Sequence, residues 1–571
     1  MYQYTDFDRQ FVRARAAQFR DQLTRNLAGQ LGDDEFRPLR LQNGWYIQRH
    51  APMLRVAVPY GELNSAQLRA LAQIAREFDR GYAHFTTRQN VQYNWIPLPQ
   101  AADVMDRLAS VDMHGIQTSG NCIRNITSDA LAGVAADEEI DPRPYCEILR
   151  QWSTLHPEFA FLPRKFKIAV SGAREDRAAI GWHDIGLKLV KNAAGEIGFR
   201  VQVGGGMGRT PIIGSVISEF VPWQQILVYI EAVVRVYNRY GRRDNAYKAR
   251  IKILVKAEGQ RFFDAVGVEF KNILERDLDG SAHLITQAEF DRVNACFVRP
   301  ASVTPRAEFD AGADDAAART SAPQAYRRWL QRNVHAHQVA GYRAVTLSVK
   351  RAGQAPGDAT DVQMDLAADL ADRYSCGELR VTHDQNLLLP WVVASDLPAL
   401  YEAAKAAGYA TPNIGLVTDM IACPGGDFCA LANARSIPVA EELTARFDDL
   451  DEVFDIGEID LHISGCINSC GHHHSGHIGI LGVDKDGTEW YQVTLGGSDG
   501  SDHAPVAVPG KVIGPSFAAS EVADAVEAIL DTYRAQRQSG EKFIDAVHRL
   551  GIEPFKAAAN AQRTATARTE A

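Results

Sequence analysis

The sequence lacks a long uninterrupted apolar stretch. None of its 571 residues belongs to a run that approaches the roughly eighteen apolar residues of a membrane-spanning helix, so no transmembrane segment is expected. The first residues, MYQYTDFDRQFVRARA, are polar and charged, unlike a secretory signal or an acid-poor transit peptide. These absences favour a cytoplasmic protein with no membrane partner.

An excess of positive charge is also missing. The chain has 61 Lys and Arg against 71 Asp and Glu, a net charge of −10, so nucleic acid is not an expected partner. If such a chain binds a small anion, it must gather positive charge locally, against its overall sign.

Cysteine is scarce, with eight residues in the whole chain, which excludes a disulfide scaffold. Four cysteines stand alone in the sequence, and each is predicted to be a packed core thiol. The other four form two close pairs in loops rich in glycine. The isolated cysteines are Cys122, Cys146, Cys296 and Cys376, and the pairs are Cys423 with Cys429 and Cys466 with Cys470.

Thiolates that converge from two loops indicate a metal or cluster site. Structural zinc usually has two to four residues between paired ligands. The five residues between Cys423 and Cys429 therefore favour a larger iron–sulfur cluster. Unliganded buried cysteines are the bland alternative. The histidines at 472–474 and His477 also suggest zinc, although a polar wall beside the cluster is the preferred interpretation.

Two further segments point to a bound group. LPRKFKIAVSG predicts a strand on which Lys165 and Lys167, two residues apart, leave the same face. Their mutual repulsion would be relieved by an anion between them, whereas simple solvation at the surface is the alternative. The glycines Gly204, Gly205 and Gly206 lack the third glycine of a dinucleotide loop, so a Rossmann site is rejected; bare backbone there would still let a large cofactor approach.

The chain contains an internal repeat. LRVTHDQNLLLPW in the second half mirrors HFTTRQNVQYNW in the first, and IGILGVDKDGTEWYQVTLGG mirrors IGLKLVKNAAGEIGFRVQVGGG. The offsets cluster between about 280 and 300 residues, which favours a duplication. Residues 299–324, rich in Ala, Pro, Asp and Ser, are expected to be a flexible linker between the halves. Because only the second half keeps the paired cysteines, one half is predicted to supply the cluster and the other the anion site.

The motifs ACPGGDFCALA and ISGCINSCGHHHSGHIGILG resemble the sirohaem-dependent sulfite and nitrite reductase family, and are most similar to its assimilatory sulfite reductase haemoprotein branch. The resemblance covers nearly the whole chain. It implies that Cys423, Cys429, Cys466 and Cys470 hold a [4Fe–4S] cluster and that Cys470 also bridges to the sirohaem iron.

The resemblance also implies roles for basic residues of the first half. A quartet would surround the substrate, and a second group would line sirohaem, whose carboxylates require a basic cradle. One departure is Asn94, where some members carry histidine. The quartet is Arg55, Arg124, Lys165 and Lys167, and the cofactor-lining group is Arg88, Gln92, Asn121, Arg164 and Gly204 to Gly206.

The expected fold class is α+β, internally duplicated, with ferredoxin-like half-domains and two sirohaem- or cluster-binding α/β domains. The expected units are an N-terminal helical arm (1–34), a ferredoxin-like half-domain (35–115), a sirohaem and substrate domain (116–298), the linker (299–324), a second half-domain (325–410), a cluster and sirohaem domain (411–556) and a disordered tail (557–571).

The expected activity is the six-electron reduction of sulfite to sulfide, with electrons from a ferredoxin or a separate flavoprotein subunit. Within the family, reduction of nitrite to ammonia is the alternative. From another class, the chain could be a non-catalytic zinc or iron–sulfur binding protein, although its paired lysines would then have no anion to bind.

Overall fold

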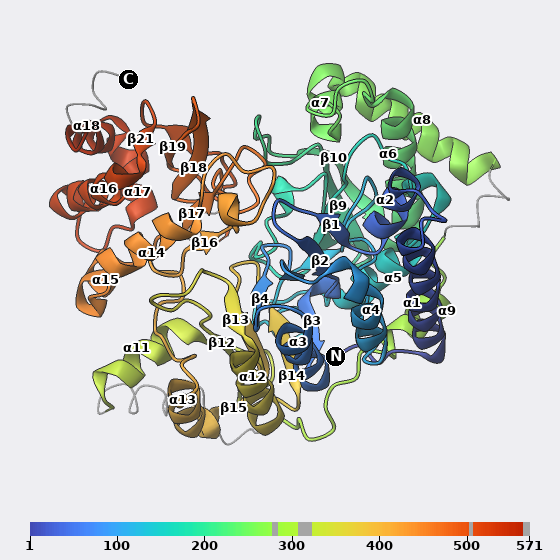
Figure 1. Ribbon diagram of the computed structural model, residues 1–571, viewed down its shortest axis with the longest axis horizontal. Coiled ribbons are helices and arrows are strands. Elements are labelled where there is room, and N and C mark those ends of the chain that lie inside the picture. Colours follow the sequence, from blue (N-terminus) through green and yellow to red (C-terminus); the bar gives the residue numbers. More distant parts are fainter. Residues whose placement is uncertain (277–283, 306–321, 502–505, 564–571) are drawn as a thin grey trace.

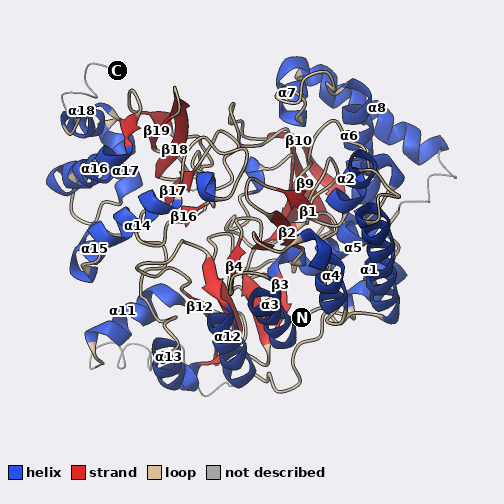
Figure 2. Cartoon of the chain, viewed as in Figure 1, coloured by secondary structure: helices blue, strands red, loops and turns tan. Residues whose placement is uncertain are grey.

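The computed structural model describes residues 1–276, 284–305, 322–501 and 506–563. Two α/β domains lie side by side, and two smaller half-domains lie below and between them (Figure 1). Helices cover the outside of each unit, and loops fill the region between the two α/β domains (Figure 2). Within the described residues, no helix combines the length and apolarity needed to cross a membrane.

Each half-domain is built on a five-stranded sheet, and each sheet takes its edge strand from the other half. The first has the order β1-β2-β5-β4-β13 and the second β11-β12-β15-β14-β3. Ala359 of β13 pairs with Ala83, and Leu63 of β3 pairs with Leu379. The strands are β1 Trp45–Ile47, β2 Pro52–Val56, β3 Glu62–Asn64, β4 Tyr82–Phe85, β5 Val91–Tyr93, β11 Val334–His335, β12 Tyr342–Leu347, β13 Asp358–Thr360, β14 Glu378–Val381 and β15 Leu387–Val393.

Helices α3 (Ser65–Phe78) and α12 (Asp361–Tyr374) pack against each other and join the half-domains. Both helices begin at equivalent capping boxes, one of them formed by Asn64 with Gln67. The surrounding helices are α1 Asp6–Leu27, α2 Asp33–Gln42, α4 Ala101–Ala109, α11 Gln324–Asn333 and α13 Leu397–Ala406.

Each α/β domain holds a mixed sheet with matching topology. In the first, β6, β7 and β8 are parallel and β9 and β10 follow antiparallel; in the second, β16, β17 and β18 are parallel and β19 returns antiparallel. The strands are β6 Thr127–Ser128, β7 Ile168–Ser171, β8 Ile185–Lys191, β9 Ile197–Val203, β10 Ser215–Pro222, β16 Ile421–Ala422, β17 Leu461–Ser464, β18 Ile478–Lys485, β19 Thr488–Leu495, β20 Lys511–Val512 and β21 Phe517–Ala518.

Helices cover both mixed sheets, and apolar side chains fill the space between. The helices of the first domain are α5 Arg143–Ser153, α6 Ile226–Tyr240, α7 Ile251–Glu258, α8 Gln260–Arg276 and α9 Gln287–Asn294. Those of the second are α14 Ile437–Arg446, α15 Leu450–Ile456, α16 Val522–Gln536, α17 Phe543–Leu550 and α18 Glu553–Ala561.

The structure departs from several expectations. The strand predicted around Lys165 begins only at Ile168, where its pairing with Ile185 of β8 begins. Cys376 is exposed rather than packed, and Cys122 and Cys296 are half-buried, which leaves only Cys146 among the isolated cysteines fully buried. The positions of these cysteines in the sequence did not predict how far each thiol is buried.

The linker and tail boundaries also differ. Val303 is buried with Tyr342 and Trp391, so the start of the predicted linker packs onto the second half-domain, whereas its central part, 306–321, lies outside the described residues. The predicted disordered tail supplies the end of α18, and Arg563 donates hydrogen bonds to the carbonyls of Ser516 and Pro515. Residues 564–571 lie outside the described chain.

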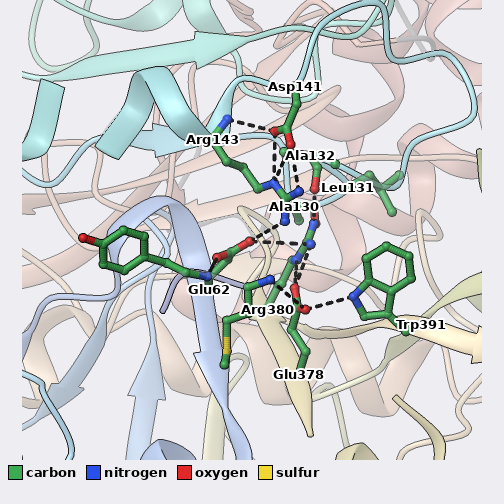
Figure 3. A network of polar contacts seen from close by, with 12 residues as sticks. Glu62, Ala130, Leu131, Ala132, Asp141, Arg143, Glu378, Arg380 and Trp391 are labelled. Atoms are coloured by element: carbon green, nitrogen blue, oxygen red, sulfur yellow. Dashed lines mark hydrogen bonds and ion pairs between the residues drawn. The ribbon is translucent and has the colours of Figure 1, made fainter. Parts of the chain in front are cut away.

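A buried network of charges joins the units (Figure 3). Arg380 of β14 donates to Glu378 at 2.8 Å and to the carbonyl of Ala132, and its guanidinium lies 3.6 Å from Glu62. Arg143 of α5 donates to the same Glu62 oxygen, Oε1, at 2.9 Å. These side chains come from both half-domains and from the first α/β domain, so the network fixes the three units relative to one another.

Removal of Arg380 should be costly, because it leaves Glu62 and Glu378 buried with less positive charge. We expect Arg380→Met to lower the free energy of unfolding by about 3–5 kcal/mol. Arg69→Met is the matched control, since its ion pairs with Asp369 and Asp372 lie at the surface and should contribute at most about 1 kcal/mol. Equal denaturation midpoints for the two variants would contradict the interpretation.

Candidate cofactor and substrate site

The pairing of β16 with β17 brings the two cysteine motifs together. Cys423 follows β16 and Cys466 follows β17 two residues beyond the strand end, and these strands are adjacent and parallel. The carboxyl ends of adjacent parallel strands lie at one edge of the sheet, so the two loops that carry the thiols start side by side.

The four thiols are close enough to influence one another. Burial and the charge of Cys470 together raise the pKa of Cys423 to about 12. Burial is also the main cause that raises the pKa of Cys429 and Cys466, and Cys470 adds to both. Thiols that resist ionisation in this way need a compensating cation, which the iron of a cluster supplies.

Backbone amides point at the sulfur atoms. The N–H of Gly465 donates to Cys423 Sγ at 3.3 Å, and that of Leu431 donates to Cys429 Sγ at 3.4 Å. Amide hydrogen bonds of this kind stabilise cluster thiolates and tune their potential. Glycine is required at one close approach, since a Cβ on Gly471 would lie 1.9 Å from the carbonyl oxygen of Ile463.

Within the described chain, no three His, Cys, Asp or Glu side chains form a group that could hold a single metal ion. Members of the histidine run have separate roles. His474 donates to the carbonyl of Gly208 at 2.9 Å, His473 is fully buried against the His474 ring, and His477 lies 3.4 Å from Asp460.

Arg55 and Arg124 meet at one carbonyl. Arg55 lies on β2 opposite Gln92 and donates to its side-chain oxygen at 2.9 Å. Arg55 and Arg124 both donate to the carbonyl oxygen of Thr118, at 3.3 and 2.8 Å. The sheet and one loop thus place two guanidinium groups together.

Lys165 and Lys167 lie just before β7, near Cys470. Burial, with Arg124 and Arg250, lowers the pKa of Lys165 to about 8, whereas Cys470 acts in the opposite direction. Burial is also the main cause that holds the pKa of Lys167 well below its usual value, followed by Arg88 and Lys165. Both ammonium groups therefore share one electrostatic environment with the Cys470 thiol.

Arg88 is a buried cation. Its guanidinium donates to His183 Nε2 and to the carbonyl oxygen of Asn125, each at 2.6 Å. Burial, with Arg124 and other neighbouring cations, lowers its pKa to about 9. Among the described residues no carboxylate forms an ion pair with Arg88, Arg55, Arg124, Lys165 or Lys167. Such a cluster of unpaired cations requires an anionic ligand.

The other predicted cofactor residues occupy the loops around these cations. Asn121 accepts a hydrogen bond from Leu162 N–H at 2.9 Å, which joins its loop to the segment with Arg164. The glycine loop is clamped by Lys252, whose ammonium donates to the carbonyl of Gly206 at 3.2 Å. Beyond Gly204 and Gly205, the loop ends at Gly208, which contacts the cluster-binding loop through His474.

Several residues of the site were not predicted. Thr87 donates to the carbonyl of Cys470 at 2.9 Å, and Arg250 pairs with buried Asp184 at 2.7 Å. Burial alone would raise the pKa of Tyr46, but Arg124, Arg55 and Lys165 lower it below the usual value. The basic sequence Arg250-Ile251-Lys252 could have indicated Arg250 and Lys252 as site residues. No local sequence feature indicates Tyr46 or Thr87.

Comparison with known proteins agrees with this arrangement. The family model described as "Nitrite and sulphite reductase 4Fe-4S domain" matches residues 119–274 and 416–566, and the "Nitrite/Sulfite reductase ferredoxin-like half domain" matches 46–111 and 335–407. The chain belongs to the nitrite and sulfite reductase family. The two positions of each match confirm the duplication and the α+β class.

Relatives in this family carry both substrate names. The chain is 28% identical over 516 residues to "Sulfite reductase [ferredoxin] 1" of Mycolicibacterium paratuberculosis, covering 88% of this chain and 83% of the relative. It is 27% identical over 512 residues to "Assimilatory ferredoxin-dependent nitrite reductase" of Haloferax mediterranei, covering 86% and 80%. The solved structure of Mycobacterium tuberculosis NirA superposes with a TM-score of 0.73 at 26% identity, covering 94% of each chain.

Members of this reductase family bind sirohaem and a [4Fe–4S] cluster, and the site fits both groups. Four neighbouring thiols with amide donors suit the cluster. Unpaired cations around Cys470 suit a tetrapyrrole that carries carboxylates.

If Cys470 holds both groups, we expect Cys470→Ser to abolish the coupling between cluster and sirohaem, because a serine oxygen would bind iron less well than a thiolate. Visible absorbance, electron paramagnetic resonance and acid-labile sulfide would report the loss independently of turnover. Exposed Cys376→Ser is the control and should keep all three signals. Retention of full activity and coupling in the Cys470 variant would contradict the assignment.

Proposed function

We propose that the chain reduces sulfite to sulfide, with six electrons supplied one at a time. The observation that supports this most strongly is the set of unpaired cations, from Arg55 and Arg124 to Lys165 and Lys167, grouped near Cys470. A small oxyanion would neutralise this group, for which the described residues provide no carboxylate partner.

When bound, the cluster and sirohaem supply the redox chemistry that no side chain can perform. The chain's own residues would bind the oxyanion and donate protons to it. Arg55 and Arg124, held by Thr118 and Gln92, present fixed N–H groups that suit oxyanion oxygens. Arg88, deeper in the site, would pair with a cofactor carboxylate.

Lys165 and Lys167 would donate protons as oxygen leaves the substrate as water. A depressed pKa makes an ammonium group a better acid, and the pKa of about 8 for Lys165 keeps most of it protonated at neutral pH. The cationic form is lost as the pH rises through that value, so both substrate binding and proton supply should decline on the alkaline side.

We expect Lys165→Ala and Lys167→Ala to lower turnover by at least about 10²-fold while sirohaem and iron contents stay near wild type. Lys271→Ala, on the exposed face of α8, is the control. In wild type, kcat/KM should fall above about pH 8 as the Lys165 ammonium loses its proton, and Lys165→Arg should keep sulfite binding while losing turnover, because a guanidinium keeps its charge but does not release a proton there. Parallel loss of cofactor and activity would make the lysines structural instead.

Reduction of nitrite to ammonia is the second candidate, because relatives of similar identity carry that name and the cations would bind either oxyanion. The test compares sulfite and nitrite at limiting concentration with reduced methyl viologen as electron donor. A larger kcat/KM for sulfite, with sulfide released, supports the proposal. A larger value for nitrite, with ammonia released, assigns the enzyme to nitrite.

We propose a ferredoxin as the physiological donor, since relatives of both substrate names carry ferredoxin in their names. The loop at Cys429 is the accessible side of the cluster motif, because Ala430 and Leu431 are exposed. Electrons would enter from this side.

A further inference from the structure

A large cavity is lined by residues other than the cations just described, although His183 in its wall contacts Arg88. Its volume is about 1030 Å³, and both halves contribute to its walls. Its lining holds eight carboxylates, among them Asp129, Asp384, Asp460 and Asp499, against three arginines, of which Arg177 is one, and five histidines. This cavity was not predicted from the sequence.

The cavity lies at the position in the second half that is equivalent, by the internal repeat, to the cation site of the first half. In the first half, Ile185 N–H donates to the carbonyl of Lys167 at 3.1 Å; in the second, Ile478 N–H donates to that of Asp460 at 3.1 Å. Lys167 N–H also bonds to the side chain of Asp184, just as Asp460 N–H bonds to His477. Asp460 thus holds the position of Lys167.

The turns between the central strands match in the same way. Thr86 N–H donates to the carbonyl of Asn90 at 2.9 Å, and Thr382 N–H donates to that of Asn386 at 2.9 Å. Gln89 and Gln385, one residue before each asparagine, both adopt positive φ, at 59° and 61°. Asp384 therefore stands where the first half has Arg88.

The place of the cluster is filled by an ion pair. Asp129 directly follows β6, as Cys423 directly follows β16. An SG motif stands at the end of β7 and again at the end of β17. Arg177 lies six residues after Ser171 of the first motif, as Cys470 lies six residues after Ser464 of the second. Arg177 Nε donates to Asp129 at 2.8 Å, and its Nη2 donates to Asp137 at 2.7 Å. Protein charges thus replace the thiolates and iron.

We propose that the charge of this mirrored cavity is inverted so that sirohaem, an octacarboxylate, loads into only one of the two pseudo-equivalent sites. Arg88 becomes Asp384 and Lys167 becomes Asp460, while Arg55 on β2 corresponds to Thr346 on β12, whose neighbours pair in the same register. A tetrapyrrole with carboxylate arms would meet carboxylates where the catalytic site offers cations.

The electrostatics of the lining support this inference. Burial and the charges of Asp419, Asp460 and Asp499 raise the pKa of Asp384 to about 7. Burial, with Asp499, likewise raises the pKa of Asp176 to about 7. Burial and neighbouring carboxylates thus already oppose ionisation of these groups, and the carboxylates of a ligand would meet the same opposition.

The test uses the holoenzyme, whose catalytic site already holds sirohaem, and uroporphyrin as a fluorescent octacarboxylate probe. Wild type should not bind the probe in the mirrored cavity. Asp384→Arg combined with Asp460→Lys restores the residue types of Arg88 and Lys167, and should bind one equivalent at least about tenfold more tightly than wild type. Binding would be followed by fluorescence anisotropy.

Asp448→Arg with Asp531→Lys makes the same change in net charge at exposed positions and should leave the probe unbound. Asp384→Asn with Asp460→Asn is a milder change, for use if the charge-reversed variant fails to fold. This variant should bind the probe more tightly than wild type but less tightly than expected for the charge-reversed variant. Retained sirohaem and cluster absorbance confirms folding in each case. The inference is overturned if wild type binds the probe as tightly as the variants, if the surface control binds equally, or if both cavity variants fold and bind none.

The inference rests on the sirohaem of the family and not on the choice of substrate. Its outcome is independent of the sulfite and nitrite assay, because probe binding is measured without turnover. Failure here would leave the proposed reaction intact.

Discussion

The exchange of edge strands between the half-domains is the constraint on which the rest of the molecule depends. β13 completes the first sheet and β3 completes the second, so neither half-domain has all its strands within its own half of the sequence. This exchange fixes the two halves in one orientation. Only in that orientation do cations from the first half face thiols from the second, and the Thr87 hydroxyl reach the Cys470 carbonyl.

Pseudo-symmetry makes two sites available, and divergence gives them opposite chemistry. In one site, the thiols and unpaired cations would be stabilised by an inorganic cluster and an anionic tetrapyrrole. In the other, Arg177 and its carboxylate partners satisfy one another within the protein. The same backbone thus supports either a cofactor or a salt-bridge network, according to a few side chains at equivalent positions.

Much of the site could be predicted from the sequence, because its signals are local. The cysteine spacing, the glycine-rich loops and the Lys165–Lys167 pair lie in short segments, and the duplication is visible in repeated strings. The strand exchange could not be predicted, since β3 and β13 have three residues each and carry no distinctive alternation. Tyr46 and Thr87 were missed because only tertiary packing brings them to the site. The length of the β7 strand was overestimated because its pairing with β8 begins only at Ile168.

The strand exchange also sets an order of events during synthesis. The first half-domain sheet lacks its edge strand β13 until residues 358–360 have left the ribosome. Until then β4 has no partner on that side, because β13 is synthesised more than 270 residues after it. The cluster loops emerge later still. The nascent first half therefore presents an open sheet edge and a concentration of unpaired cations for most of translation, and cofactor insertion can begin only when the chain is almost finished.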